Sequence, residues 1–397
     1  MSKSKLVKPI AMYFPQLHRI PENDQWWGEG FTDWVNVKAA QPQFDGHYQP
    51  RVPLGFNYYD QSKIETMRWQ IDLAKSYGMY GFCHYHYWFD GKQLLETPTN
   101  LMLDNKDLDM PFCLSWANET WSKRWDGQNN NILIKQTHPP SKERWKLHFN
   151  YLIKAWRDKR AIKVNNKPVF IIYRPHNIQE VHNMIDYWRE LALDNGLDGL
   201  YLVYQKQYEL PDRECLEAFD AVFQFQPFEA IYDFASSSNS LSSTILVRFF
   251  RMLPETAKKA FRSLRSQFAN GLTLYDYDSV WEHIVAVRTD PDLVTFPGAF
   301  VDWDNTARYK KKATVFQNVS IERFEYWLTR LVKSMPKRDI PEPFIFINAW
   351  NEWAESTYLE PDEKNGYDFL AALQRALAET ETSIFKGSGQ GSYGSSV

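Results

Sequence analysis

Short apolar runs recur along the chain, and most are separated by stretches in which apolar residues return every three or four positions. Such runs are typical of strands buried on both faces, whereas the wider spacing is typical of amphipathic helices. Helices are expected between most of the runs, for example over residues 141–158 and 367–378. The pattern predicts eight strands, at residues 10–14, 80–88, 111–116, 168–173, 200–204, 221–225, 296–301 and 344–347.

This alternation predicts an α/β fold in which eight parallel strands close into a (β/α)8 TIM barrel. The chain has 397 residues, and such a barrel needs about 250, which leaves room for long βα loops. We predict one catalytic domain over residues 1–385, with a helical insertion of about residues 229–280 after the sixth strand, and a disordered Gly/Ser tail at residues 386–397. A doubly wound open sheet is the alternative, but the sequence has no glycine-rich phosphate fingerprint.

Charge and composition narrow the choice of partners. The chain has 46 basic and 49 acidic residues and a net charge of -3, so no basic excess points to nucleic acid. Its three cysteines form no disulfide framework. The first residues lack a secretory apolar region, and no run reaches the about 18 apolar residues of a membrane span. We therefore expect a cytoplasmic chain that binds no nucleic acid.

The segment at residues 241–268, within the insertion, is strongly basic. Pro254 divides it into two expected helices with basic residues largely on one face. An ordinary amphipathic pair packed on the barrel accounts for this pattern. A second hypothesis is peripheral contact with an anionic inner-membrane surface.

Two carboxylates, Glu352 and Glu355, follow the last predicted strand and lie beside two tryptophans. In a (β/α)8 barrel the strand ends converge on the face where active sites lie. Paired carboxyl groups commonly cleave glycosidic bonds, one as an acid and the other as a base or nucleophile. The alternative is a surface turn with two solvated glutamates.

Other polar and aromatic residues lie at or near the predicted strand ends or in the long loops between them. Polar groups bind sugar hydroxyls, and aromatic rings stack on the C–H faces of sugars. Arg174 is also a candidate ion-pair partner for a site carboxylate, and the alternative is that it neutralises a charge inside the barrel. The candidate substrate-binding residues are Tyr13, Trp27, His84, His86, Trp88, Trp116, Asn118, Glu119, Arg174, Gln205, Gln226, Asp302, Asn348, Trp350, Asn351 and Tyr358.

His84 and His86 share one face of their strand, as metal ligands require. A metal hydrolase that adds Asp302 or Asp304 as ligands therefore competes with sugar binding, and packing in the core is a third interpretation.

The chain resembles the WbsX-like, glycoside hydrolase family 99-like proteins, which are related to endo-α-mannosidases and often described as lipopolysaccharide biosynthesis proteins or glycosyltransferases. The similar stretches are YFPQLHRIPENDQWWGEGFTDWVNV, GHYQP, YGFCHYHYWFDGKQLLE, PFCLSWANETWSKRWDG, KPVFIIYRP and INAWNEWAESTYLEPD. The resemblance implies a (β/α)8 barrel that uses no metal or organic cofactor. It also implies that Glu352 assists the substrate's own 2-hydroxyl as the nucleophile, and that Glu355 is first the general acid and then the general base.

The chain departs from the mannosidases at two positions of this motif. Ala354 stands where they have His, which bears on substrate specificity. Ser356 stands where Gly is usual, and Gly tolerates backbone angles that Ser does not, so the turn that aims Glu355 can differ.

Together these features predict a retaining glycoside hydrolase or transglycosidase acting on α-linked mannose- or rhamnose-like residues of a bacterial surface polysaccharide, either O-antigen or capsule. A nucleotide-sugar glycosyltransferase of lipopolysaccharide O-antigen biosynthesis is one alternative, and a non-catalytic glycan-binding barrel is another. We expect Glu352 and Glu355 to open into one pocket lined by His86, Trp116, Asn118 and Arg174.

Overall fold

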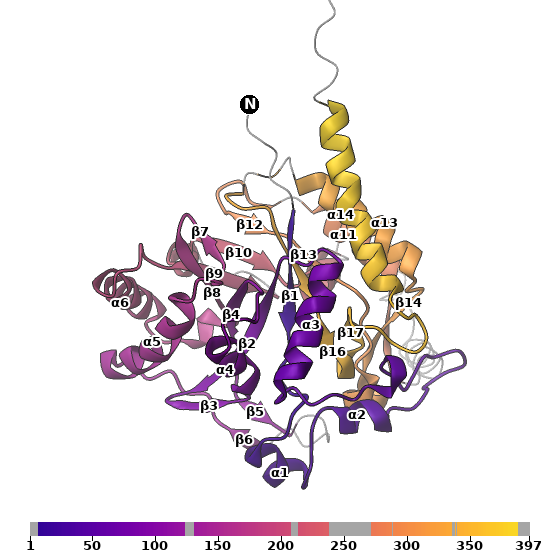
Figure 1. Ribbon diagram of the computed structural model, residues 1–397, viewed down its shortest axis with the longest axis horizontal. Coiled ribbons are helices and arrows are strands. Elements are labelled where there is room, and N and C mark those ends of the chain that lie inside the picture. Colours follow the sequence, from indigo (N-terminus) through magenta and orange to yellow (C-terminus); the bar gives the residue numbers. More distant parts are fainter. Residues whose placement is uncertain are drawn as a thin grey trace, which may run out of the picture.

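The computed structural model describes residues 7–123, 131–207, 213–237, 271–287, 289–335, 338 and 340–387 (Figure 1). The basic segment at residues 241–268 lies outside the described residues, and so does the predicted Gly/Ser tail from residue 388 onward.

Nine parallel strands form a nearly closed barrel, which confirms the predicted fold class (Figure 1). Each predicted strand position is occupied. In the sheet, neighbouring strands follow the order β12-β10-β9-β8-β4-β2-β1-β15-β13. The strands are β1 (Lys8–Tyr13), β2 (Gly81–Phe89), β4 (Phe112–Trp116), β8 (Lys167–Ile172), β9 (Tyr201–Lys206), β10 (Ala221–Gln224), β12 (Thr295–Phe296), β13 (Gly298–Phe300) and β15 (Phe344–Asn348).

The predicted seventh strand, residues 296–301, is two strands rather than one. Pro297 divides it into β12, which pairs with β10, and β13, which pairs with β15. Proline has no N–H to give to a ladder, so a break at this residue is expected. Because β10 and β15 lie toward opposite ends of the sheet order, this short segment is the seam that brings the barrel near closure.

Helices cover the outer face of the barrel, as Figure 1 shows for α3, α5 and α6. None of the described helices is long and apolar enough to cross a membrane. The helices that follow or flank the strands are α3 (Ile64–Ser76), α4 (Thr97–Asp104), α5 (Lys142–Trp156), α6 (Val181–Asp194), α7 (Arg213–Glu217), α8 (Phe228–Ser237), α11 (Tyr277–Ala286), α13 (Ile321–Ser334) and α14 (Asp368–Gly387).

The strands are buried on both faces, and alternate residues along them enter two different cores. One core includes Met12, Cys83 and Phe223 and draws its members from strand after strand, so it fills the barrel interior. The other joins strand residues such as Phe82 to helix residues such as Phe149, so it lies between the barrel and its helices. Which face a strand residue occupies therefore decides whether it can reach the barrel mouth.

The loops after the strands gather at one end of the barrel, in the lower half of Figure 1. They include short helices and two-stranded ladders, and they build the walls of the site described below. These elements are α1 (Pro21–Trp27), α2 (Trp34–Ala39), η1 (Leu54–Phe56), β3 (Lys92–Leu94), β5 (Trp121–Ser122), β6 (Ile132–Ile134), η3 (Pro175–Asn177), α12 (Thr306–Tyr309), η4 (Lys310–Lys312), β16 (Asn351–Glu352), η6 (Trp353–Glu355) and β17 (Thr357–Tyr358). Two further ladders are β7 (Lys163–Val164) with β8, and β11 (Thr273–Asp276) with β14 (Thr314–Gln317).

The seam gives a test of the fold. A Cβ at Gly298 would lie 1.8 Å from the carbonyl oxygen of Gln224, so Gly298→Ala must push β13 away from β10. Gly196→Ala is the matched control, because Gly196 has a φ of +77° with open space around it and costs only about 1 to 2 kcal/mol of backbone strain. We expect Gly298→Ala to lower the thermal midpoint, measured by circular dichroism, well below that of Gly196→Ala. Equal midpoints would contradict the close approach at the seam.

Candidate active site

One guanidinium, that of Arg308, holds three carboxylates together just beyond the end of β15. Its Nη2 donates to Asp33 Oδ2 at 2.5 Å and to Glu352 Oε1 at 2.8 Å, and its Nη1 donates to Glu355 Oε1 at 2.7 Å. Arg308 and Asp33 are buried, and the side chain of Glu352 is 8% exposed against 18% for Glu355. Because both glutamates bind the same cation, their carboxyl groups point to the same side of the turn.

Local structure at the end of β15 explains this convergence. The chain forms a small ladder in which Asn351 pairs with Tyr358, and η6 fills the turn between the two strands. Glu352 ends the first strand of the ladder and Glu355 ends η6. Ser356 then takes the left-handed conformation, with a φ of 57°, which returns the chain to β17. The side chain of Asn351 pins this ladder to β1, because it exchanges two hydrogen bonds with the backbone of Phe14 at 2.8 and 2.9 Å.

Burial and charge act in opposite directions on the two glutamates. Burial raises the pKa of Glu352 well above its ordinary value, and the Arg308 guanidinium offsets only part of that rise. The pKa of Glu355 is also raised by burial, again partly offset by Arg308. For Arg308, burial opposes its charge, but the three carboxylates outweigh burial and raise its pKa further. A carboxyl group with a raised pKa can hold a proton near neutral pH and donate it.

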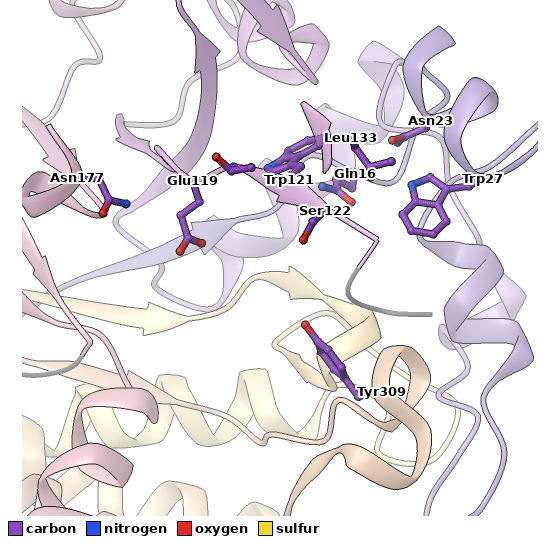
Figure 2. A pocket seen from close by; sticks show the side chains of 10 residues that line it. Gln16, Asn23, Trp27, Glu119, Trp121, Ser122, Leu133, Asn177 and Tyr309 are labelled. Atoms are coloured by element: carbon purple, nitrogen blue, oxygen red, sulfur yellow. The ribbon is translucent and has the colours of Figure 1, made fainter. Parts of the chain in front are cut away.

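The cluster lies in a cleft of about 420 Å³ with mixed aromatic and polar walls. A second cavity of about 360 Å³ adjoins it (Figure 2) and shares with it Gln16, Glu119, Trp121 and Tyr309. The residues that line the first cavity are Phe14, Gln16, Tyr85, Tyr87, Ala117, Glu119, Trp121, Tyr173, Arg174, Phe225, Phe228, Trp303, Asn305, Arg308, Tyr309, Lys312, Asn348, Glu352 and Glu355.

Six of the candidate residues named from the sequence line these cavities. Arg174 lies in the cleft with the two glutamates, but its guanidinium pairs with Glu119 instead of with either of them. Arg174 thus pairs with a carboxylate of the cleft, which is one of its two expected roles, whereas the cation that binds the two glutamates is Arg308. Five of the six line the first cavity: Glu352, Glu355, Glu119, Arg174 and Asn348. The sixth, Trp27, lines the second cavity, which Glu119 also lines.

The residues of β2 that line the cleft lie on the opposite face of the strand from the residues that the sequence suggested. His86 lies in the outer core, where its Nε2 is 2.8 Å from His148 Nε2. Tyr85 and Tyr87, which alternate with His84 and His86, line the cleft instead. Successive residues of a strand point to opposite faces, so the histidines and the cleft cannot share a side of β2.

The outer-face residues are used in packing and internal hydrogen bonds. His84 is 3.3 Å from Thr99 Oγ1, and burial lowers its pKa to about 3. No group of three or more His, Cys, Asp or Glu side chains in the described residues is placed to hold a metal ion. On the same outer face, Tyr13 donates to Gln70, Trp88 stacks parallel to His148, Trp116 donates to the Trp88 carbonyl, and Trp350 packs against Phe82.

The remaining candidates support the barrel mouth without lining the cleft. Asn118 bonds to both the N–H and the carbonyl of Arg174, and so fixes the backbone that carries a cleft residue. Asp302 accepts from Arg51 at 2.8 Å. The expectation that His86, Trp116 and Asn118 line the pocket is therefore not met. Elsewhere, Gln205 accepts from Ser115, Gln226 donates to Glu229, and Tyr358 donates to Asp362.

Sequence reasoning missed Arg308, Asp33 and the cleft tyrosines. A pair of glutamates at a buried strand end does require a nearby cation, because an unpaired buried charge is very unfavourable. The sequence has 46 Lys and Arg residues, however, and nothing in the spacing marks Arg308 as the one that folds onto the pair.

Comparisons with known proteins identify the family and the fold of the chain. The family model described as Glycosyltransferase WbsX matches residues 9–373, which is most of the chain. The chain belongs to the WbsX glycosyltransferase family. This is a family of glycan-active enzymes. WxcX of Xanthomonas campestris pv. campestris strain B100 is 35% identical over 370 residues, which cover 93% of this chain and 49% of WxcX. The WxcX protein of strain ATCC 33913 matches equally, at 35% over 373 residues. The chain thus spans about half the length of these relatives.

Solved structures with a similar fold include a GH99 endo-α-mannosidase from Bacteroides thetaiotaomicron, with a TM-score of 0.53, 13% identity, and coverage of 95% of this chain and 98% of that one. A glycoside hydrolase-like protein has a TM-score of 0.56 at 12% identity and covers 95% of both chains. At these identities the likeness concerns the fold.

The raised pKa of Glu352 predicts how stability depends on pH. A neutral buried carboxyl contributes fully below the unfolded-state pKa near 4.5, and that contribution is lost as pH rises through the higher folded-state pKa. Each unit of the shift corresponds to about 1.4 kcal/mol. Glu352→Gln stays neutral, so we expect it to gain stability relative to the parent as pH rises above 4.5. Urea unfolding over a pH series measures this difference. The control is Glu282→Gln, because Glu282 is an exposed residue of α11. A difference that does not change with pH would show that burial leaves Glu352 unperturbed.

Proposed function

We propose that the chain is a retaining glycoside hydrolase or transglycosidase that acts on α-linked mannose- or rhamnose-like residues of a bacterial surface polysaccharide. The observation that carries the proposal is the convergence of Glu352 and Glu355 on Arg308 in the aromatic-walled cleft at the barrel mouth. Membership of a glycan-active family supports the substrate class, and the mannosidase-like fold supports the choice of reaction.

The charge of the cluster suits acid–base chemistry. Three carboxylates face one guanidinium, so a proton held by one carboxyl relieves the excess negative charge. In the proposed first step, Glu352 takes the proton of the sugar 2-hydroxyl, and the resulting oxygen attacks C1. The bond from C1 to the leaving oxygen breaks, and that oxygen takes the proton of Glu355.

The second step reverses these roles. Glu355, now ionised, takes a proton from a water molecule or a sugar hydroxyl, whose oxygen attacks C1 and opens the 1,2-anhydro ring. The 2-oxygen recovers its proton from Glu352. Two inversions at C1 give net retention of configuration, and the choice between water and a sugar acceptor separates hydrolysis from transfer. The side chain of Glu355 is the more exposed of the two, as a group that meets both leaving group and acceptor must be.

The cleft walls suit a polyhydroxylated ring. Tyr85, Tyr87 and Tyr173 line the cavity with phenol side chains, and Phe228 and Trp303 line it with apolar rings. Hydroxyls bond to sugar hydroxyls, whereas aromatic faces pack on sugar C–H groups. Transfer from a nucleotide sugar is the second candidate, because the family description names a glycosyltransferase.

Variants of the two glutamates test the proposal. We expect Glu352→Gln and Glu355→Gln each to lower kcat/KM on α-linked mannose and rhamnose oligosaccharides at least about a hundredfold, because each loses a proton-transfer group. Glycan binding should persist in both, and proton NMR of the first product formed by the parent should show the starting anomeric configuration. Glu282→Gln, exposed on α11, should match the parent.

Two outcomes would overturn the proposal. Glycan binding without turnover in the parent as well as both variants would leave a non-catalytic glycan-binding barrel. Tight binding of a nucleotide sugar by calorimetry, with transfer and no cleavage of glycans, would assign the chain to nucleotide-sugar transfer.

A further inference from the structure

Asp304 connects the turn that carries Glu355 to the helix that carries Arg308, and it does not line the cleft. Its backbone N–H donates to the carbonyl oxygen of Glu355 at 2.9 Å. Its carboxylate Oδ1 accepts from the N–H of Thr306 at 3.0 Å, and Thr306 is the first residue of the short helix α12 that carries Arg308. One buried residue therefore ties the turn that bears Glu355 to the helix that bears its counter-charge.

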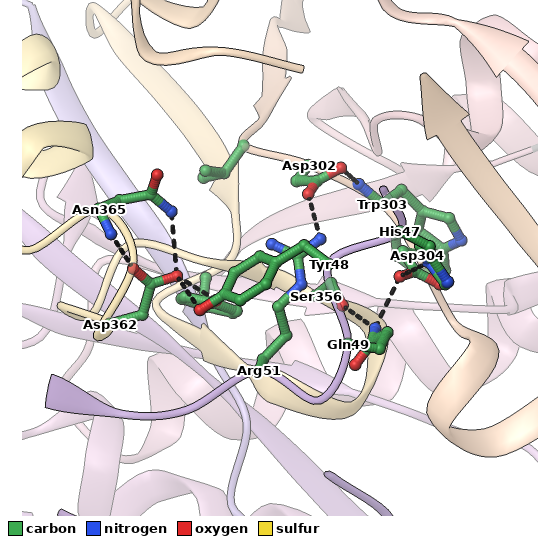
Figure 3. A network of polar contacts seen from close by, with 12 residues as sticks. His47, Tyr48, Gln49, Arg51, Asp302, Trp303, Asp304, Ser356, Asp362 and Asn365 are labelled. Carbon is green, nitrogen blue, oxygen red and sulfur yellow. Dashed lines mark hydrogen bonds and ion pairs between the residues drawn. The ribbon is translucent and has the colours of Figure 1, made fainter. Parts of the chain in front are cut away.

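A segment of the long loop after β1 holds the other carboxylate oxygen of Asp304 (Figure 3). The amide Nε2 of Gln49 donates to Asp304 Oδ2 at 2.6 Å and to Ser356 Oγ at 3.0 Å. These two bonds use both hydrogens of the amide, and turning it over would set Oε1 against a carboxylate. Gln49 thus bridges Asp304 to the left-handed residue that directly follows Glu355.

His47 completes the arrangement. Its Nδ1 accepts from the backbone N–H of Gln43 at 3.0 Å, so Nε2 carries the proton and donates to Asp304 Oδ2 at 2.8 Å. The two oxygens of Asp304 then accept three bonds from protein donors, and the residue is 1% exposed. A carboxylate whose oxygens are already bonded in this way acts through the groups it holds, and the metal-ligand role that the sequence suggested does not fit it.

We infer that Asp304, braced by Gln49, is a positioning residue that sets the placement of Glu355 against Arg308. This inference rests on the proposed function for its kinetic consequences, but not for its structural ones. The titratable and charged groups around Glu355 include Arg308, Glu352, Asp33 and Tyr87, and the favourable one is Arg308 at 2.7 Å. If the bonds made by Asp304 are lost, Glu355 moves away from Arg308, its attractive neighbour in that set. Glu355 remains buried, so its pKa rises further.

Asp304→Asn tests the inference, because it replaces one carboxylate oxygen with an NH2 group. That group cannot accept a hydrogen bond, so at least one of the three N–H donors loses its partner. We expect kcat to fall between about tenfold and about a hundredfold with KM within about twofold, as a misplaced catalytic group gives. The limb of the kcat–pH profile that reports Glu355 should move to higher pH. The double variant Asp304→Asn/Gln49→Glu restores a donor–acceptor pair with reversed polarity, and should recover part of kcat.

The control is Asp158→Asn. Asp158 is also buried and also held by protein donors, Arg160 and Lys106, and it lies outside the residues that line the cleft. We expect it to lose stability while keeping the parent's kcat and pH profile. A kcat and pH profile in Asp304→Asn that match those of Asp158→Asn would overturn the inference.

A readout that needs no activity separates this inference from the proposed function. In urea unfolding, the midpoint shifts of Asp304→Asn and Glu355→Gln should not add, because a neutral residue 355 no longer depends on its distance from Arg308. The shifts of Asp158→Asn and Glu355→Gln should add. Non-additivity in a chain that turns over no glycan would reject the proposed function alone, whereas additivity of Asp304→Asn with Glu355→Gln in an active enzyme would reject the positioning role alone.

Discussion

The site depends on one interaction, the contact of the Arg308 guanidinium with three carboxylates, of which Asp33 and Glu352 are buried and Glu355 is partly exposed. Taking these charges out of water is costly, and their mutual attraction repays that cost only when the geometry is good. The chain supplies that geometry from three distant places, since Asp33 precedes α2, Arg308 lies on α12, and the glutamates follow β15. The loops at the barrel mouth are thereby fixed to one another, and burial raises the pKa of both glutamates.

The barrel makes this arrangement possible because it delivers the ends of all its parallel strands to one mouth. The seam at Pro297 and Gly298 lets the sheet curl until β10 and β15 flank the same short segment. Inward-facing residues in the second half of the strands, such as Tyr85 and Asn348, then become the walls of the cleft. Outward-facing neighbours such as His84 pack under the helices and fix the strands that carry those walls.

The barrel and the Glu352–Glu355 pair could be predicted from the sequence, but most of the residues that form the walls of the cleft could not. Apolar runs and turn residues report strands and their ends, so the strand positions were predictable. A strand buried on both faces shows no alternation of polar and apolar residues. The sequence therefore could not decide whether the face of His86 or the face of Tyr85 points into the barrel. Arg308 was not predictable for another reason: its three partners lie 44, 47 and 275 residues away along the chain, and only the folded loops bring them together.

The central claim is that Glu352 and Glu355 both have raised pKa values and influence each other, and direct titration of the two carboxyl groups tests it most closely. Carbon-13 NMR of protein labelled at the glutamate carboxyl carbon, followed from about pH 4 to about pH 9, can be assigned with Glu352→Gln and Glu355→Gln. We expect both carboxyls to titrate above their ordinary value of 4.5, and Glu352 to titrate at lower pH once Glu355 is replaced, because the neighbouring negative charge is then gone. Ordinary titration of both groups, or a Glu352 signal that ignores the loss of Glu355, would contradict the account.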